Sequence, residues 1–316
     1  MIIDNLISGI NKMAVSGHVH PDGDCLGSVL GIFDYVQKNY PDIEIDMFLE
    51  RPGDGLSFLK NVDKIKHEPC ENVCYDLMIC VDCASIERLG MARTIFENAA
   101  HTVNIDHHIS NTEYAEINHV HGGASSCCEV LYGLMDKNKL DADIATALYV
   151  GIVTDTGVFK YEATSPNTMR VAADLMEFNI PTNKLIDDCF YLKSFAENRI
   201  MGYALAKSRL YCEGRIIAST LTIDEMNDYG ATNKDLDGIV SQLKLTKGSE
   251  LAVFMYETSS NEFKLSLRTG PTIDANTIAM KFGGGGHIRA AGASLHGELN
   301  ECFEAVMKEA KEAIMR

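Results

Sequence analysis

The sequence predicts an α/β protein in which a mostly parallel, doubly wound sheet is joined by helices to a smaller α+β domain. Apolar runs typical of strands alternate with helical patterns up to about residue 160, as in βαβ units. Helical patterns alone continue from about 166 to 208, and hairpin patterns begin at Arg209. We therefore expect one domain at 1–190, a helical linker at 191–208 and a second domain at 209–316.

The elements of the first half follow from the spacing of apolar residues. An i, i+3, i+4 stripe predicts an amphipathic helix at 2–12. Further patterns predict strands at 13–19, 43–49, 75–81 and 102–105, and helices at 26–39, 91–99, 124–137 and 141–153. The run 75–81 is apolar throughout, which is typical of a strand buried on both faces.

The second half predicts two hairpins and a glycine-rich loop. The hairpins lie at 210–222, with a turn at Glu213-Gly214, and at 251–268, with a turn at 259–261. Helices are expected at 235–243, 274–281 and 298–315. The segment KFGGGGHIRAAGASL contains Gly283, Gly284, Gly285 and Gly286, followed by His287. Glycines let a backbone approach a ligand closely, so we prefer a ligand-binding loop to the alternative of a flexible linker.

Composition describes an ordinary globular protein. The 316 residues are 46% hydrophobic and 23% charged. The first residues do not resemble a signal peptide, and no run reaches the ~18 apolar residues of a membrane span, so we expect a cytoplasmic protein. The ten cysteines are expected to be reduced. Cys80 and Cys83 form one Cys-x-x-Cys, but no second pair stands at zinc spacing.

The formal net charge of −17 bears on the class of partner. Binding of long nucleic acid depends on lysine and arginine against phosphates, so we exclude long duplex nucleic acid. A small phosphorylated substrate remains compatible with this charge if bound cations supply positive charge locally.

Ionisable side chains cluster where the predicted strands end. Asp106, His107 and His108 follow the strand 102–105, and Asp82 ends the strand 75–81. The loop GHVHPDGDCLGS places His18, Asp22 and Asp24 within seven residues, and Asp155 is expected in a loop after the helix 141–153. In open α/β sheets ligands bind beyond the carboxyl ends of the strands. A structural role is equally open for the Asp-Gly-Asp turn, since Asp24 also suits the N-cap of the next helix.

Together these residues supply four carboxylates and two imidazoles, a donor set that suits two divalent cations. Metal ions in such pairs lie about 3.5–4 Å apart, and Asp82, from a central strand, is the natural bridge. Two such ions promote in-line displacement at phosphorus. The pattern therefore indicates metal-dependent phosphoester hydrolysis, and no P-loop or Gly-x-Ser-x-Gly sequence competes with it.

Five motifs in order resemble a known family. GHVHPDGDCLGS, ICVDCAS, VNIDHHISN and IVTDTGVF are similar to the four motifs of the DHH phosphoesterases, and FGGGGHIRAAG is similar to the glycine-rich motif of their DHH-associated C-terminal domain. The two-domain size most resembles the oligoribonuclease (nano-RNase) branch that also dephosphorylates 3′-phosphoadenosine 5′-phosphate.

This resemblance implies a role for each candidate residue. His18, Asp22 and Asp82 would hold one Mn²⁺, and Asp24, Asp82, His107 and Asp155 the other, with Mg²⁺ or Co²⁺ as substitutes. His108 would contact the scissile phosphate, and Asp106 would orient a histidine ligand from behind. Arg268 and the Gly283–His287 loop would hold the rest of the nucleotide. His20 lies where the family is variable.

The expected substrates are very short oligonucleotides, cleaved to nucleoside 5′-monophosphates, and adenosine 3′,5′-bisphosphate. Cyclic or linear signalling dinucleotides are an alternative that the sequence does not separate. An inorganic pyrophosphatase fits less well, because the pyrophosphatases of this superfamily lack such a glycine-rich loop. A nucleotide-binding sensor without turnover is disfavoured by the complete ligand set. No feature decides between a monomer and a homodimer.

Overall fold

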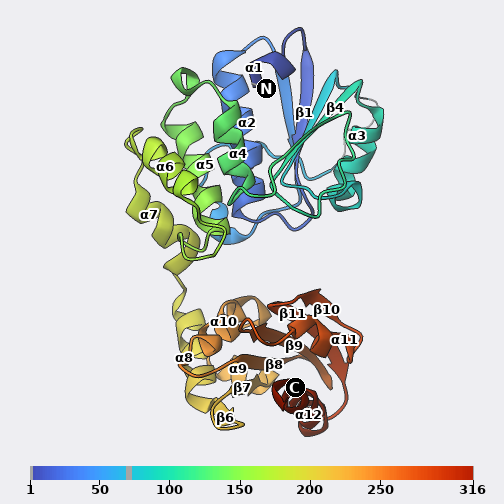
Figure 1. The fold of residues 1–316 in the computed structure, drawn as a ribbon, viewed down its shortest axis with the longest axis vertical. Helices are drawn as coiled ribbons and strands as arrows, with labels where there is room; N and C mark the ends of the chain where they lie inside the picture. Colours follow the sequence, from blue (N-terminus) through green and yellow to red (C-terminus); the bar gives the residue numbers. More distant parts are fainter. Residues whose placement is uncertain (1–2, 69–72, 316) are drawn as a thin grey trace. The chain divides into compact units, whose positions relative to one another are not determined.

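The chain folds into two compact units, Met1–Leu192 and Lys193–Arg316. The computed structural model describes residues 3–68 and 73–315 (Figure 1). The segment 191–208, expected as a linker, contains helix α8 (Phe195–Lys207), whose Ile200 and Ala204 are buried in the second unit. This helix is therefore an integral part of the second unit.

The first unit is built on a five-stranded parallel sheet, which confirms the predicted fold class. Its strands are β1 (Lys12–Ser16), β2 (Glu44–Phe48), β3 (Leu77–Val81), β4 (His101–Asp106) and β5 (Ile117–Val120), in the order β2-β1-β3-β4-β5. The edge strand β5 was not predicted, because its four half-buried residues carry no apolar run.

Helices cover both faces of this sheet. The larger core joins one face to α2 (Gly23–Asn39), α4 (Cys127–Leu134) and α5 (Ala142–Asp155). The other face packs against α3 (Arg93–Asn98) and the preceding 3₁₀ segment Ile86–Ala92. Alternate residues of β3 divide between the two cores, Ile79 facing the first and Met78 the second. The unit is completed by α1 (Ile3–Leu6), α6 (Pro166–Met176), α7 (Thr182–Ile186) and a π-helical turn at Asp187–Tyr191.

Two local predictions for this unit were wrong. The first helix ends at Leu6 and not at residue 12, because Gly9 adopts a positive φ of 80° and β1 begins at Lys12; Ile2 lies outside the described residues. Asp155 is the last residue of α5 and does not lie in a loop. Its helix continues two residues past the predicted end, and Thr156 forms the C-cap.

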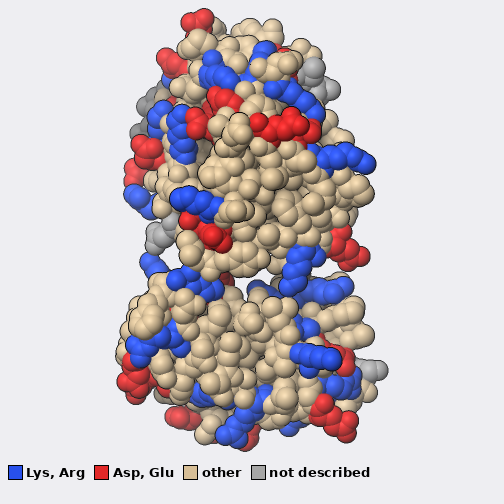
Figure 2. Space-filling view, turned by 90° about the vertical axis from the view of Figure 1, so that its left-hand side faces the viewer, with Lys and Arg blue, Asp and Glu red and all other residues tan. Residues whose placement is uncertain are grey.

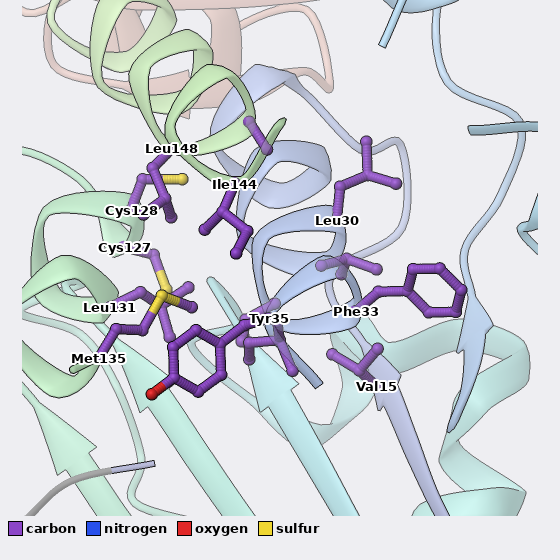
Figure 3. Packing of buried hydrophobic residues seen from close by; sticks show 14 of the residues in the cluster. Val15, Leu30, Phe33, Tyr35, Cys127, Cys128, Leu131, Met135, Ile144 and Leu148 are labelled. Carbon is purple, nitrogen blue, oxygen red and sulfur yellow. The ribbon is translucent and has the colours of Figure 1, made fainter. Parts of the chain in front are cut away.

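Among the described residues, the most extensive helix contact of the first unit lies between α2 and α5. A Cβ on Gly27 would stand 2.4 Å from the Ala147 carbonyl oxygen, so only glycine permits this separation. Figure 3 shows the neighbouring apolar layer, in which Tyr35 of α2, Leu131 of α4 and Ile144 of α5 are packed together. Helix α2 starts at the sheet's carboxyl edge, so this packing fixes the position of the loop that precedes it.

The second unit contains a six-stranded mixed sheet in the order β10-β11-β9-β8-β7-β6. Its strands are β6 (Arg209–Tyr211), β7 (Ile216–Leu221), β8 (Leu251–Ser259), β9 (Glu262–Thr269), β10 (Gly285–His287) and β11 (Ala290–His296). Both predicted hairpins are present as antiparallel pairs, β6 with β7 and β8 with β9. Only β7 and β8 run parallel.

Helices lie on both faces of this second sheet. Helices α11 (Ala275–Met280) and α12 (Leu299–Met315) pack on one face, and α8, α9 (Ile223–Asp228) and α10 (Ile239–Lys244) pack on the other. The nine cysteines among the described residues are free, including Cys80 and Cys83, which are buried. Over the described ranges, none of the helices is both long and apolar enough to cross a membrane.

The tight contact of α2 with α5 gives a test of this packing. Gly27→Ala should lower the free energy of unfolding of the first unit by about 1–3 kcal/mol, because the added methyl meets backbone that cannot move aside. Gly133→Ala is the matched control, since a Cβ at this exposed position in α4 meets nothing within 4 Å. It should stabilise by about 0.5–1 kcal/mol. The free energy of unfolding of both variants can be measured by urea denaturation. Equal changes in Gly27→Ala and Gly133→Ala would contradict the tight packing of α2 against α5.

Candidate metal centre

Six side chains predicted from separate motifs meet at the carboxyl edge of the parallel sheet. The Nε2 of His18 lies 3.3 Å from Asp82 Oδ2 and 3.8 Å from Asp22 Oδ2. The Nε2 of His107 lies 3.4 Å from Asp82 Oδ1, 3.6 Å from Asp155 Oδ2 and 3.8 Å from Asp24 Oδ2. Each histidine therefore faces a set of carboxylates, and the two sets share one member. Asp82 belongs to both sets, with one oxygen turned to each.

The ends of elements position these side chains. Asp82 follows β3 directly with a positive φ of 50°, a backbone conformation that is strained for a residue with a Cβ. The carboxylate of Asp22 caps α2, accepting hydrogen bonds from the backbone N–H groups of Asp24 and Cys25. The N-cap role that the sequence left open for Asp24 thus falls to Asp22, whose Oδ2 remains turned toward His18.

Asp24 is tied to a different helix. Its two carboxylate oxygens accept the backbone N–H groups of Cys127 (2.6 Å) and Cys128 (3.0 Å) in the first turn of α4. Gly151 makes room for it, because a Cβ there would lie 2.8 Å from Asp24 Oδ1. Gly23 lets the loop approach α5, because a Cβ there would lie 2.3 Å from Thr154 Oγ1. The loop after β1, α4 and α5 are therefore packed together around this carboxylate.

The electrostatics of the centre favour a bound cation. Burial raises the pKa of Asp24 well above its usual value, and the nearby charges of Asp82 and Asp155 raise it further. The pKa of Asp155 rises to about 6, first because of burial. Burial lowers the pKa of His107, but Asp82, Asp24 and Asp155 outweigh it and raise the value to about 10. The raised pKa values mean that, in the metal-free chain, the folded state favours the protonated forms of Asp24, Asp155 and His107.

The first unit as a whole is strongly acidic. It holds 13 Lys and Arg against 29 Asp and Glu, a formal charge of −16, while the second unit is close to neutral. On the face of the molecule shown in Figure 2, acidic and basic side chains are interspersed and neither kind forms a continuous surface. The carboxylates of Asp24 and Asp82 are instead buried, so the repulsion between them is felt in a medium of low dielectric constant.

The donor atoms fit divalent cations. Asp82 Oδ1 is buried and has no hydrogen-bond partner among the described residues, which is costly for a carboxylate oxygen that nothing else meets. Two ligands of one ion, each about 2.1 Å from it, stand about 3 Å or more apart, as these donors do. In each of two groups of residues, the possible ligand atoms lie within 4.8 Å of one another. One group is Asp24, His107 and Asp155; the other is His18, Cys25 and Asp82. Cys25 was not predicted; burial raises the pKa of its thiol well above the usual value.

Asp106 organises the remaining histidine. Its Oδ1 lies 2.8 Å from the Nδ1 of His108 and accepts the backbone N–H of His107 at 2.8 Å. The ring of His107 is held differently, with its Nδ1 3.3 Å from the Ala124 carbonyl oxygen. The carboxylate thus orients the ring of His108, whereas the sequence led us to expect it behind a metal ligand. A proton on His108 Nδ1 leaves Nε2 as the reactive nitrogen of this ring.

Two asparagines that sequence reasoning missed hold Asp106 in place. The side-chain amide of Asn111 donates to Asp106 Oδ2 and to Asn104 Oδ1 (2.7 Å). Asn104 lies within β4, fully buried, and its own amide reaches the Tyr114 hydroxyl at 3.1 Å. A polar side chain inside an apolar strand was the available signal, since such groups are retained with hydrogen-bond partners. His20, in contrast, is exposed and lies against Glu50.

In the second unit, Arg268 and His287 occupy one row of the sheet. His287 pairs with Ala290, and Ala290 pairs with Arg268. Residues directly opposite in antiparallel strands point to the same face. The small Ala290 therefore separates an imidazole from a guanidinium on one face. The side chain of Arg268 is half-buried and that of His287 exposed, while alternate residues such as Leu267 are buried on the other face.

The four glycines do not all have the same role. A Cβ on Gly284 would lie 2.1 Å from the Gly292 carbonyl oxygen, and one on Gly286 would lie 2.5 Å from that of Ala290. Gly283 has a positive φ of 70°. Packing and backbone conformation thus account for these three glycines without a ligand. Gly285 has neither constraint: its φ lies outside the left-handed region, and the nearest atom to an added Cβ would be Asn276 Oδ1 at 3.7 Å.

A parallel sheet with candidate cation ligands along its carboxyl edge, together with a separate mixed-sheet unit, is the architecture expected of a two-domain, metal-dependent phosphoesterase. Residues 12–152 match the DHH family, N-terminal domain, and residues 213–316 match the DHHA1 domain, so that the two matches span more than three quarters of the chain. The chain belongs to the DHH family of phosphoesterases.

Similar proteins of known name span nearly the whole chain. The bifunctional oligoribonuclease and PAP phosphatase NrnA of Thermus thermophilus is 29% identical over 307 residues, covering 96% of this chain and 90% of its own length. The Bacillus subtilis protein of the same name is 29% identical over 296 residues, covering 92% and 91%. The crystal structure of an exopolyphosphatase-related protein from Bacteroides fragilis superposes with a TM-score of 0.88 at 22% identity, covering 98% and 94%. This last likeness concerns the fold.

The protonation of the centre gives a test of its charge balance. The folded-state pKa of His107, about 10, exceeds that of an unfolded histidine, about 6.5. The stability it contributes is therefore complete below pH 6.5 and is lost as the pH rises through 10. With a chelator present, the free energy of unfolding of the wild type should fall between pH 6.5 and pH 10 by about 4 kcal/mol more than that of His107→Gln.

The control for that experiment is His119→Gln, which removes a histidine outside the centre whose pKa is lowered chiefly by burial. It should keep the wild-type dependence on pH. Excess divalent cation should abolish the dependence in the wild type, because an imidazole ligand is neutral when bound. Identical slopes in the wild type and His107→Gln would show that the carboxylates do not hold a proton on His107.

Proposed function

We propose that this chain is a Mn²⁺-dependent phosphoesterase that releases nucleoside 5′-monophosphates from very short oligonucleotides and removes the 3′-phosphate of adenosine 3′,5′-bisphosphate. The observation that carries the proposal is the carboxylate of Asp82, buried between two histidines with one oxygen turned to each. The relatives named as oligoribonuclease and PAP phosphatase, similar over nearly the full chain, support the choice of substrates.

The residues divide into two cation sets that share Asp82. His18 and Asp22 would complete one set, and Asp24, His107 and Asp155 the other. Imidazole together with carboxylate oxygens suits Mn²⁺. When bound, two such cations lower the pKa of a water molecule and offset the charge on the phosphate oxygens. The formal charge of −16 on the first unit explains why an anionic substrate requires them.

The remaining side chains bind and orient the substrate. The His108 ring, fixed by Asp106, presents Nε2 to the scissile phosphate and is placed to pass a proton at that atom. Arg268 and His287, on one sheet face, would bind a second phosphate of the nucleotide, because a guanidinium forms paired hydrogen bonds with phosphate oxygens. Gly285 leaves room for backbone to approach the same ligand. We assign a substrate with two phosphates, or a phosphodiester with a terminal phosphate, on this basis.

Initial rates with Mn²⁺ on a panel of substrates test this proposal. The panel comprises adenosine 3′,5′-bisphosphate, a 5′-phosphorylated diadenylate, cyclic diadenylate, a longer oligoribonucleotide and pyrophosphate. We expect chelator-sensitive release from the first two and a steep fall with chain length, and we expect Asp82→Ala to lose turnover while remaining folded. Preference for the cyclic dinucleotide would move the function to signal breakdown. No turnover of any substrate, or full activity in Asp82→Ala, would refute the proposal.

The network behind His108 gives a second prediction. Asn111→Ala should lower kcat about 10–100-fold, because Asp106 loses the amide that holds its Oδ2 and the His108 ring is no longer fixed. The Mn²⁺ concentration for half-maximal activity should change little, since Asn111 contacts none of the proposed cation ligands. Asn98→Ala, which removes an exposed amide bonded only to the Thr94 carbonyl oxygen, is the control. An unchanged kcat in Asn111→Ala would exclude a positioning role.

A further inference from the structure

A cavity of about 320 Å³ lies in the second unit, away from the residues discussed so far. It is formed by the end of α8, by β6 and β7, and by the first turn of α12. Strand β6 is one edge of the six-stranded sheet, whereas the glycine-rich strand β10 is the opposite edge. The cavity is therefore separate from the Arg268 and His287 row. Its volume is in the lower range of small-molecule sites.

Polar side chains without partners line this cavity. Within the part of the chain that the structure describes, the side chains of Arg209, Thr220 and Asn300 form no hydrogen bond and no ion pair. A second cation, Lys207, is already paired with Glu225. The guanidinium of Arg209 thus supplies one uncompensated positive charge and five N–H donors. A phosphate is an anion whose geometry matches this group, through two parallel N–H···O hydrogen bonds.

An aromatic wall completes the cavity. Tyr211 of β6 and Phe303 of α12 both line it, with ring centroids 6.4 Å apart, and Lys311 lies 5.8 Å from the Tyr211 ring centroid. Arg209 and Tyr211 stand two residues apart on one strand and therefore project from the same face. An anion held at Arg209 would accordingly have a flat aromatic surface beside it. A base stacked on an aromatic side chain gains about 1–3 kcal/mol.

We propose that this cavity is a second nucleotide-binding site, which takes a nucleoside monophosphate with its phosphate at Arg209 and its base against Tyr211 and Phe303. The amide of Asn300 and the hydroxyl of Thr220 supply the hydrogen-bonding groups that such a ligand needs for its sugar or base. Its residues include none of the proposed cation ligands, so binding does not require divalent cations. The site goes beyond the proposed function and does not depend on it.

Binding of adenosine 5′-monophosphate to the full chain in the presence of a chelator tests the proposal by calorimetry. Chelation removes the divalent cations and prevents turnover, so the result is independent of the catalytic proposal. We expect saturable binding to the wild type and at least about tenfold weaker binding to Arg209→Ala, because the ligand loses a charge-assisted hydrogen bond. Arg268→Ala should retain the binding that Arg209→Ala loses, because the cavity lies at the opposite edge of the sheet from β10.

The matched control is Lys247→Ala, which removes one exposed positive charge from the same unit outside the cavity. It should bind like the wild type. Equal affinities in Arg209→Ala and the wild type, or loss of binding in Arg268→Ala, would overturn the assignment. If adenosine binds as tightly as adenosine 5′-monophosphate, Arg209 holds no phosphate. If inorganic phosphate competes as strongly as the nucleotide, the cavity takes only an anion. Either result would overturn the nucleotide assignment.

Discussion

The repulsion among buried carboxylates at one sheet edge is the constraint on which the rest of the first unit depends. Asp24 and Asp82 are withdrawn from water and stand near Asp155. Like charges in such surroundings are tolerated only when positive charge lies between them. In the metal-free chain a proton on His107 supplies part of that charge, because the carboxylates raise its pKa to about 10 against the effect of burial. The pKa of His18 is raised in the same way, by Asp82 and Asp22 against the effect of burial. Bound cations would supply more.

Several structural features serve to hold these charges together. The first turn of α4 donates two backbone N–H groups to Asp24, and the positive end of a helix dipole favours a carboxylate there. Gly27 and Gly151 bring α2, α4 and α5 close enough for that contact. Asp82 adopts a strained backbone conformation, a cost that is commonly found at functional sites. Tight packing on this side of the sheet is therefore the structural counterpart of the charge cluster.

Most of this arrangement could be predicted from the sequence, because ionisable residues after apolar strands must meet at one sheet edge. That rule located His18, Asp82 and His107 from β1, β3 and β4. It misplaced Asp155, whose helix runs two residues further than its apolar pattern. It also gave no indication of Asn111, since the partner of Asp106 depends on how the chain folds back after His108. In the glycine-rich segment, the sequence could not distinguish Gly285 from Gly284 and Gly286. Gly284 and Gly286 must be glycine because they pack closely against β11, whereas a Cβ on Gly285 would make only an ordinary contact, with Asn276 Oδ1.

On the proposed function, the Asp82 carboxylate would be shared by two divalent cations at the sheet edge. Anomalous diffraction from crystals grown with Mn²⁺ tests it most directly. We expect two anomalous peaks about 3.5–4 Å apart, with the Asp82 carboxylate between them, one peak beside His18 and Asp22 and the other beside Asp24, His107 and Asp155. A single peak, or two peaks that do not share Asp82, would contradict it.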